Sequence, residues 1–406
     1  MNPVKGLVKF VSLHIRAIQS TDARVWDGYV YAHPQATLYH LYGWRNVIEK
    51  TYGHKTYYLA AIKDTPTSSI PAKVGIFDQH PASSIQHPAL VGILPLVHLK
   101  HFLFGSSLIS MPFFDLGGIL ADDKETEQAL LFHAIGLGQD LKANIIELRH
   151  TQPLKCLNST NSTNPTNPTN SKNPINTTNS INTLPFMTRS HKARMLLDLP
   201  DSPEMLMKSF RSKLRSQIRK PIKEGLSIKI ASLELLEVFY KVFSINMRDL
   251  GSPVHSKKLI RNVLEEFPEK AKIAMVYKDA QPIACSLIIN FKNILENPWA
   301  SALRKYSSLS PNMLLYWSML KYACQNGLTQ FDFGRSTPGE GTYKFKEQWG
   351  AKPTAFHWLY VSLNGHQIND EASEKSRFEP AVKYWQKLPV PITRIIGPMI
   401  RKHIGL

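Results

Sequence analysis

Apolar positions in the first part of the chain follow two spacings, which predict helices and strands in alternation. A recurrence every three to four residues is typical of a helix with one buried face, and a short apolar or alternating run is typical of a strand. We therefore expect helices over residues 42–52 and 125–141, and strands over residues 56–62, 90–99 and 144–148. The segment over residues 64–87 is expected to be an inserted loop.

The pattern is clearer after residue 190. Leu206, Phe210, Leu214 and Ile218 recur at a spacing of four residues, which predicts one helix over residues 203–224. Further helices are expected over residues 232–249, 256–266, 312–325 and 342–349, and strands over residues 194–199, 272–277, 282–290, 299–303, 330–333 and 356–361. Strands and helices in this order predict an α/β fold.

An Asn-rich tract separates the two halves. An asparagine stands at every third position from Asn158 to Asn182, with Ser, Thr and Pro prominent between them. The tract has too few apolar residues to offset the entropy cost of ordering, so we expect a disordered linker. The predicted organisation is an N-terminal domain over residues 1–155, a linker over 156–190, a C-terminal domain over 191–365 and a basic amphipathic tail over 366–406.

The composition is that of a globular protein with an excess of positive charge. Of 406 residues, 43% are hydrophobic and 20% are charged, and 49 Lys and Arg against 31 Asp and Glu give a net charge of +18. This charge favours anionic partners: nucleic acid, phosphorylated substrates or acidic lipids. We expect a cytoplasmic protein without a transmembrane segment, because the three cysteines show no CxxC spacing and neither a signal-peptide pattern nor a membrane-spanning run is present. The histidines show no metal-ligand spacing, so no metal is expected.

Nine short motifs form a recognisable set. In the second half they are SKLRSQIRKP at 212–221, NMRDLG at 246–251, PWAS at 298–301, LSPNML at 309–314, FDFGRS at 331–336 and GTYKFKEQWGA at 341–351. In the first half they are YGH at 52–54, GILPL at 92–96 and IELRH at 146–150. On these motifs, residues 20 to 362 resemble FemAB-like proteins, relatives of the GNAT acyltransferases, and most closely the subgroup associated with exosortase and PEP-CTERM systems.

The resemblance implies two tandem GNAT-like domains, each a mixed central sheet flanked by helices. It also implies transfer of an acyl group, often an aminoacyl group, to an amine of a cell-envelope precursor. In such a sheet the donor lies where the fourth and fifth strands separate, which would be residues 299–303 and 330–333 here. Acyl transfer to an amine requires an oriented carbonyl, a donor for the developing oxyanion and a path for the proton of the amine.

Lys346 is our first candidate for a catalytic residue. It follows Phe345 and matches the Phe-Lys pair of the family, in which this lysine is thought to stabilise charge during transfer. Tyr343, Phe345 and Trp349 would supply a water-poor surrounding, in which an ammonium acts strongly on an oxyanion. The alternative is that Lys346 is a solvated helix residue like Lys344.

Asp332 and Arg335 are the next candidates. Asp332 stands between Phe331 and Phe333, so its carboxylate is expected on the opposite face of the strand from both rings, where it needs a partner or a function. Arg335 is expected either to pair with Asp332 or to bind an anionic substrate. Structural pairing and a substrate site are equally compatible with this pattern.

The loop before the helix over 312–325 bears on the acyl donor. Arg304 to Ser310 contains no glycine, unlike the phosphate loop of GNAT proteins that bind CoA, which favours aminoacyl-tRNA or another carrier over acyl-CoA. Arg304 and Asn312 flank the expected helix N-terminus and are candidates for substrate binding. The alternative is a helix capped by Ser310 with an ordinary polar loop.

The helix over 203–224 and the tail carry two further surface patterns. The helix over 203–224 has seven cations, and no acid stands between Met205 and Ile222. The resemblance associates this region with a nucleotide-linked glycan substrate, which we carry to Arg215 and Arg219. An ordinary solvated face is the alternative. The tail has isoleucines on one helical face, which predicts either contact with the inner face of a membrane or docking on the protein's own surface.

These observations predict an acyltransferase that acts on an amine of a cell-envelope glycan, peptidoglycan or exopolysaccharide precursor. The substrate would be an anionic small molecule or glycan precursor, and the donor would be aminoacyl-tRNA or acyl-CoA. The alternative is a non-catalytic adaptor with a GNAT fold that binds RNA or a membrane surface through its basic face.

Overall fold

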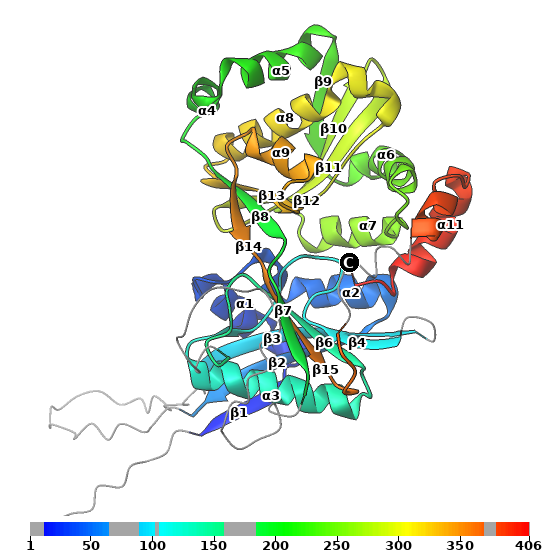
Figure 1. Ribbon diagram of the computed structural model, residues 1–406. Helices are drawn as coiled ribbons and strands as arrows, with labels where there is room; N and C mark the ends of the chain where they lie inside the picture. Colours follow the sequence, from blue (N-terminus) through cyan, green and yellow to red (C-terminus); the bar gives the residue numbers. More distant parts are fainter. Residues whose placement is uncertain (1–11, 65–88, 102–104, 158–183, 369–378, 406) are drawn as a thin grey trace, which may run out of the picture.

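The computed structural model describes residues 12–64, 89–101, 105–157, 184–368 and 379–405 (Figure 1). The inserted loop expected over 64–87 and the Asn-rich tract lie almost wholly outside these residues. The described chain forms two mixed sheets with helices on their faces, as the α/β prediction of two tandem domains requires.

The first sheet is built mainly from the N-terminal part of the chain. Its strand order is β1 (Leu13–Ala17), β2 (Lys55–Lys63), β3 (Ala89–His101), β4 (Gly105–Ile109), β6 (Ile145–His150), β15 (His357–Ser362) and β7 (Phe186–Arg189), and β5 (Leu120–Ala121) pairs with β3. Helix α3 (Lys124–Asp140) packs on this sheet, and α1 (Ala23–Ala32) and α2 (Gly43–Tyr52) contact β3 and β2. Short 3-10 turns occupy Ser20–Asp22 and Leu38–His40.

The second sheet belongs to the C-terminal part. Its strand order is β14 (Lys352–Ala355), β8 (Ala193–Asp198), β13 (Gln330–Ser336), β12 (Ile294–Ala302), β11 (Gln281–Phe291), β10 (Ala271–Lys278) and β9 (Leu226–Ala231). Its helices are α4 (Pro203–Ser209), α5 (Ser212–Lys223), α6 (Leu236–Asp249), α7 (Lys257–Glu266), α8 (Pro311–Gln325) and α9 (Gly341–Glu347), with 3-10 turns at Leu233–Leu235 and Arg304–Leu309.

Alternation along β10 explains why both faces of this sheet are covered. Ile273 and Met275 join the core that contains α6 and α7, whereas Ala274 and Val276 join the core that contains α5 and α8. Helix α7 in turn packs against α2, so the first of these cores continues into the N-terminal part (Figure 1).

The helix expected over 203–224 is two helices. Phe210 and Arg211 have extended backbones, with ψ angles of 146° and 151°, and they separate α4 from α5. The break turns the ring of Phe210 into the core, where it lies 5.6 Å from the ring of Trp349 in an edge-on arrangement. The spacing of four persists across the break, because Leu206, Phe210, Leu214 and Ile218 all lie in one buried cluster.

The chain passes between the sheets through two short connections that lie side by side. Residues 190–192 join β7 to β8, and Phe356 joins β14 to β15. Phe356 N donates to Lys192 O across the two connections, so β7–β8 and β14–β15 form one antiparallel ribbon shared by both sheets (Figure 1). Residues 357–362, which we expected at the end of the C-terminal domain, therefore pair in the first sheet.

The tail ends in α11 (Val390–Arg401), which packs on α6 at the edge of the molecule (Figure 1). Residues 402–405 then run along the first sheet, where Phe113 N donates to Gly405 O at 2.5 Å. A Cβ on Gly405 would lie 2.8 Å from the Ile109 side chain at the end of β4. Within the part of the chain that the structure describes, no helix is long and apolar enough to span a membrane.

Candidate functional site

Each sheet contains one parallel strand pair that separates after three residues. In the second sheet, β12 and β13 pair from Ile294 with Gln330 to Glu296 with Asp332 and then diverge. In the first sheet, β4 and β6 pair from Ser107 with Ile145 to Ile109 with Glu147. The divergence of β12 from β13 lies where the resemblance places the acyl donor.

Strand β13 has a bulge next to this opening. The pairing of β13 with β8 shifts register between Asp332 and Arg335. Gly334 has a φ of +73°, a conformation that favours glycine, and its N–H donates to Asp332 Oδ1 at 2.7 Å. The bulge thus interrupts the ladder between Asp332 and Arg335, at the residues that line the opening.

A small cavity lies at the opening. Both parts of the chain contribute to its wall, which consists of Tyr39, Asp115, Leu116, Arg194, Glu296, Asn297, Pro298, Asp332, Gly334 and Phe356. We name it the β12–β13 cavity.

Three buried charges meet in this cavity. Arg194 Nε lies 2.6 Å from Asp332 Oδ2, and Arg194 Nη2 lies 3.6 Å from Glu296 Oε1, which is beyond hydrogen-bond distance. Glu296 Oε1 and Arg194 Nη2 are buried atoms without a hydrogen-bond partner among the described residues. The two atoms lie within ion-pair distance of each other, and each lacks the hydrogen bond that buried polar atoms nearly always form.

The electrostatics favour a carboxyl group that can exchange a proton near neutral pH. Burial raises the pKa of Glu296 to about 7, although the nearby Arg194 guanidinium acts in the opposite direction. The negative charge of Asp332 adds to the rise, and a hydrogen bond from Tyr39 opposes it. A pKa near the operating pH is what a general base requires.

Lys346 is buried behind the bulge. Its Nζ donates to Arg335 O at 2.8 Å and to Gly334 O at 3.1 Å, both at the bulge. Burial lowers the pKa of Lys346 to about 8, and the charges of Asp332 and Asp115 oppose that shift. Lys346 thus contacts Gly334, which lines the β12–β13 cavity, but is not itself among the lining residues.

The water-poor surrounding expected for Lys346 is present. Tyr316 stacks on Phe333 with ring centroids 5.4 Å apart, and Phe345 meets Tyr316 edge-on at 5.1 Å. Trp349 is buried in the same cluster, and Tyr343 packs against it while staying half-buried.

Asp332 and Arg335 do not pair with each other. The ion-pair partner of Asp332 is Arg194 on the neighbouring strand, whereas Arg335 Nε lies 3.4 Å from Asp115 Oδ1. The guanidinium of Arg335 also lies 5.4 Å from the ring centroid of Trp358. Asp115 belongs to the N-terminal part, and Trp358 lies on β15 of the first sheet. Arg335, on β13 of the second sheet, therefore links the two sheets beside the cavity.

The other candidate substrate residues lie away from this cavity. Arg304 and Asn312 are exposed around the start of α8, and Ser310 makes no capping hydrogen bond, since its backbone is left-handed with a φ of +55°. Arg215 and Arg219 lie on α5, which packs on α8 and on the edge strand β9. Lys220 Nζ donates to Ser308 O at 2.7 Å, so α5 and the loop before α8 form one cationic surface.

Sequence reasoning missed Arg194, Glu296 and Tyr39. A signal for Glu296 existed, because it follows Leu295 inside a strand that is otherwise apolar at that end. Neither Arg194 nor Tyr39 carries such a signal, because each reaches the cavity only through long-range strand pairing and sheet contact.

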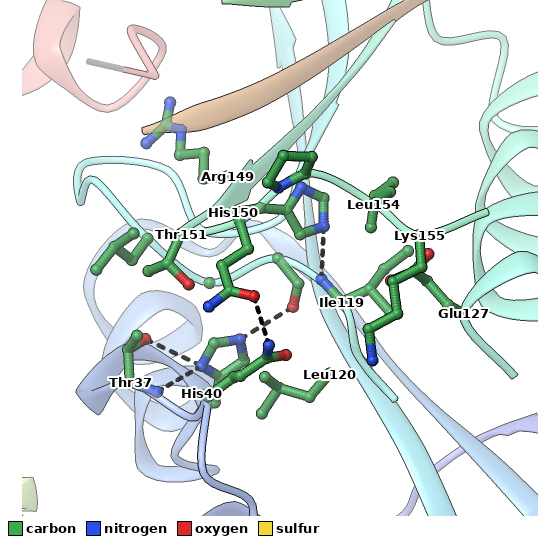
Figure 2. A pocket seen from close by; sticks show the side chains of 16 residues that line it. Thr37, His40, Ile119, Leu120, Glu127, Arg149, His150, Thr151, Leu154 and Lys155 are labelled. Atoms are coloured by element: carbon green, nitrogen blue, oxygen red, sulfur yellow. Dashed lines mark hydrogen bonds between the residues drawn. The ribbon is translucent and has the colours of Figure 1, made fainter. Parts of the chain in front are cut away.

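A second hollow lies in the N-terminal part between the Gly117–Gly118 loop and the 3-10 turn that contains His40 (Figure 2). His40 Nε2 is 3.0 Å from Gly118 O, and His150 Nε2 accepts from Ile119 N at 3.0 Å. Burial lowers the pKa of His40 to about 4 and that of His150 to about 3, so both are neutral and hold the loop in place. Among the residues described by the structure, no group of three or more His, Cys, Asp or Glu could hold a metal ion.

Comparison with known proteins supports the assignment of the second part of the chain. Residues 208–347 match the model of an acetyltransferase (GNAT) domain, which spans β9 to β13 and the cavity residues Glu296 and Asp332. No curated protein matches the chain.

Among solved structures, the chain is similar to FemX, with a TM-score of 0.58 at 15% identity over 86% of this chain and 96% of that one. A tandem GNAT protein from the clavulanic acid biosynthesis pathway matches with a TM-score of 0.46 at 10% identity, over 88% of this chain and all of that one. The C-terminal domain of a putative lysylphosphatidylglycerol synthetase from Agrobacterium fabrum matches with a TM-score of 0.45 at 11% identity, over 72% of this chain and 85% of that one. The predicted fold is confirmed, with a GNAT domain in the second part.

Proposed function

We propose that this protein is an acyltransferase that joins an acyl or aminoacyl group to an amine of a cell-envelope glycan, peptidoglycan or exopolysaccharide precursor. The observation that carries the proposal is the buried carboxylate of Glu296 at the opening between β12 and β13, whose Oε1 forms no hydrogen bond among the described residues and lies 3.6 Å from Arg194 Nη2. That opening lies within the segment that matches the GNAT model. Membership of the exosortase and PEP-CTERM subgroup stays a prediction from the motifs.

Glu296 is proposed as the general base. The amine nitrogen attacks the acyl carbonyl carbon, a C–N bond forms, and the bond from that carbon to the sulfur or oxygen of the carrier breaks. The proton leaves the amine for Glu296, and the released thiolate or alkoxide takes up a proton. Asp332 stays paired with Arg194.

Lys346 is proposed as a positioning residue. Its two hydrogen bonds fix the carbonyls of Gly334 and Arg335, so they hold open the bulge that forms one wall of the cavity. Its charge adds a positive potential on the side where an oxyanion would develop.

The direct test is transfer of label to acceptors. We expect the purified chain, given radiolabelled acetyl-CoA or aminoacyl-tRNA with a mixture of nucleotide-linked and lipid-linked envelope glycans, to label an acceptor. Glu296→Gln should lower the rate about 100-fold or more, since general-base catalysis contributes on that order. Glu237→Gln is the matched control, because Glu237 is exposed and pairs with Lys257 at the surface.

If Glu296→Gln and Glu237→Gln label the acceptor at equal rates, Glu296 is not the general base. Absence of transfer from either donor, together with retained binding of RNA or vesicles, would favour a non-catalytic adaptor.

The donor is proposed to be aminoacyl-tRNA, with acyl-CoA as the alternative, and Arg215 and Arg219 are proposed to contact its phosphates. Replacing both with Gln should weaken tRNA binding and flatten its dependence on salt, because each phosphate contact contributes a slope of about 0.7 to 0.9. Arg261→Gln on α7 is the control, because it is a partly exposed arginine elsewhere on the same domain. If tRNA binding by the wild type and by the Arg215/Arg219 double variant depends equally on salt, the assignment is contradicted.

A further inference from the structure

The orientation of α11 on the body of the protein is fixed by polar contacts. Arg394 Nε donates to Ser244 Oγ at 2.7 Å, and Arg401 Nε donates to His255 Nε2 at 3.0 Å. Gly397 allows close approach, because a Cβ there would lie 3.0 Å from Val254 N. The buried side of α11 therefore consists of Thr393, Gly397 and Arg401 rather than its large apolar residues.

The large apolar residues of α11 face outward. Ile392 is 45% exposed, Ile395 is 69% exposed and Met399 is 62% exposed. At 100° per residue these three positions lie within about 60° of one another around the helix axis. A surface helix normally buries such residues against the core, so their exposure marks a contact surface.

The surroundings of this apolar face are cationic. Lys241, Lys383 and Lys387 are exposed on α6 and on the segment before α11, and Lys402 follows the helix. Among the described residues, acids on α6 and on the segment before α11 are each paired with a cation: Glu379 with Lys383 at 2.9 Å, Asp249 with Arg248 at 2.7 Å and Glu237 with Lys257 at 2.8 Å. An apolar helix face bordered by lysines is complementary to a bilayer surface that contains anionic lipid.

A second copy of the chain fits this face less well. Self-association through α11 would bring the lysines of one copy against those of the other, which is repulsive. The apolar face also belongs to one convex helix and is not a groove, so it offers a partner little area to bury.

We propose that α11 binds the headgroup region of a membrane that contains anionic lipid, with Ile392, Ile395 and Met399 inserted among the acyl chains. The helix lies along the surface and does not cross it. This surface is separate from the β12–β13 cavity and does not depend on acyl transfer.

The test is sedimentation of the full chain with lipid vesicles. We expect binding to phosphatidylcholine vesicles with about 30 mol% phosphatidylglycerol, and weaker binding to pure phosphatidylcholine or at about 0.5 M salt. Ile395→Ser combined with Met399→Ser should lower the vesicle-bound fraction at least about tenfold, because two apolar side chains no longer insert. Val25→Ser combined with Met205→Ser is the matched control, since both residues are more than half exposed on other elements.

Thermal unfolding checks that the serine variants are folded like the wild type. Because each substituted residue is exposed, the melting temperature should not change. Equal vesicle binding by the α11 double variant and the wild type would overturn the proposal. So would a wild-type dimer in solution that is lost in the α11 variant without any binding to vesicles. Glu296→Gln should bind vesicles like the wild type. Vesicle binding therefore tests the role of α11 separately from the proposed acyl transfer.

Discussion

Lys346 Nζ donates to the main-chain carbonyl of Arg335 at 2.8 Å, in a position where the side chain is almost wholly buried. A lysine is seldom buried unless its hydrogens are satisfied, and a second bond to Gly334 O at 3.1 Å satisfies another. Lys346, the lysine of the Phe-Lys motif, therefore contacts the cavity wall through the backbone of β13.

Replacing Lys346 with Met should reduce transferase activity more than stability. The lost hydrogen bonds destabilise the bulge, whereas removal of a buried cation favours folding, so the two effects partly cancel. We expect at least a tenfold loss of kcat/KM and a change in the free energy of unfolding within about 1 kcal/mol. Lys344→Met, at an exposed position of the same helix, should leave both unchanged, and equal activity of the two variants would contradict the positioning role.

The activity should rise with pH around neutrality. The folded pKa of Glu296 is about 7, above the ordinary value of 4.5, so the base is protonated in mildly acidic solution and ionised above about pH 7. The kcat/KM profile should therefore climb through about pH 7, and Glu296→Gln should show low activity without that limb. A wild-type profile that is flat between about pH 6 and 8 would count against Glu296 as the base.

The same group should make stability depend on pH with the opposite sign. Because the folded pKa is raised, its contribution to stability is fully present below about pH 4.5 and is lost as pH rises through about 7. The wild type should therefore lose stability relative to Glu296→Gln between about pH 5 and 8. Urea unfolding of both proteins over this range measures the difference, and parallel curves would refute it.

Arg194→Met should destabilise the protein strongly. It leaves Asp332 and Glu296 buried without their cation, and breaking a buried ion pair in this way costs about 3 to 5 kcal/mol. Arg219→Met, at an exposed position, should change the free energy of unfolding by less than about 0.5 kcal/mol. Adding Asp332→Asn and Glu296→Gln to Arg194→Met should recover most of the loss, and no recovery would mean that packing, not charge, is responsible.

The two halves of the chain should remain associated when they are produced separately. Fragments over residues 1–157 and 184–406, expressed together, should co-purify, because β7 and β15 of the second fragment pair in the sheet of the first. Size-exclusion chromatography measures this. Elution of the two fragments as separate species would contradict the shared ribbon.

The local elements could be predicted from the sequence because their signals are local. The strands expected over 272–277 and 282–290 and the helix over 312–325 correspond to β10, β11 and α8, each set by its own apolar spacing. The break in the helix over 203–224 could not be predicted, since the apolar spacing of four continues across Phe210.

The partners of the charged residues depend on the topology of the sheets. Arg335 was a reasonable partner for Asp332 because it is near in sequence, yet the actual partner, Arg194, is 138 residues away and reaches it through the pairing of β8 with β13. The place of residues 357–362 in the first sheet is a long-range outcome of the same kind.

The two halves differ at the opening between their parallel strands. Gly405 lies where β4 and β6 separate, the counterpart of the opening between β12 and β13, and a Cβ on it would lie 2.8 Å from the Ile109 side chain. One of the two equivalent places is thus already taken by the protein's own backbone. A calorimetric titration with a tight-binding donor analogue should accordingly saturate at one equivalent per chain, despite the internal duplication.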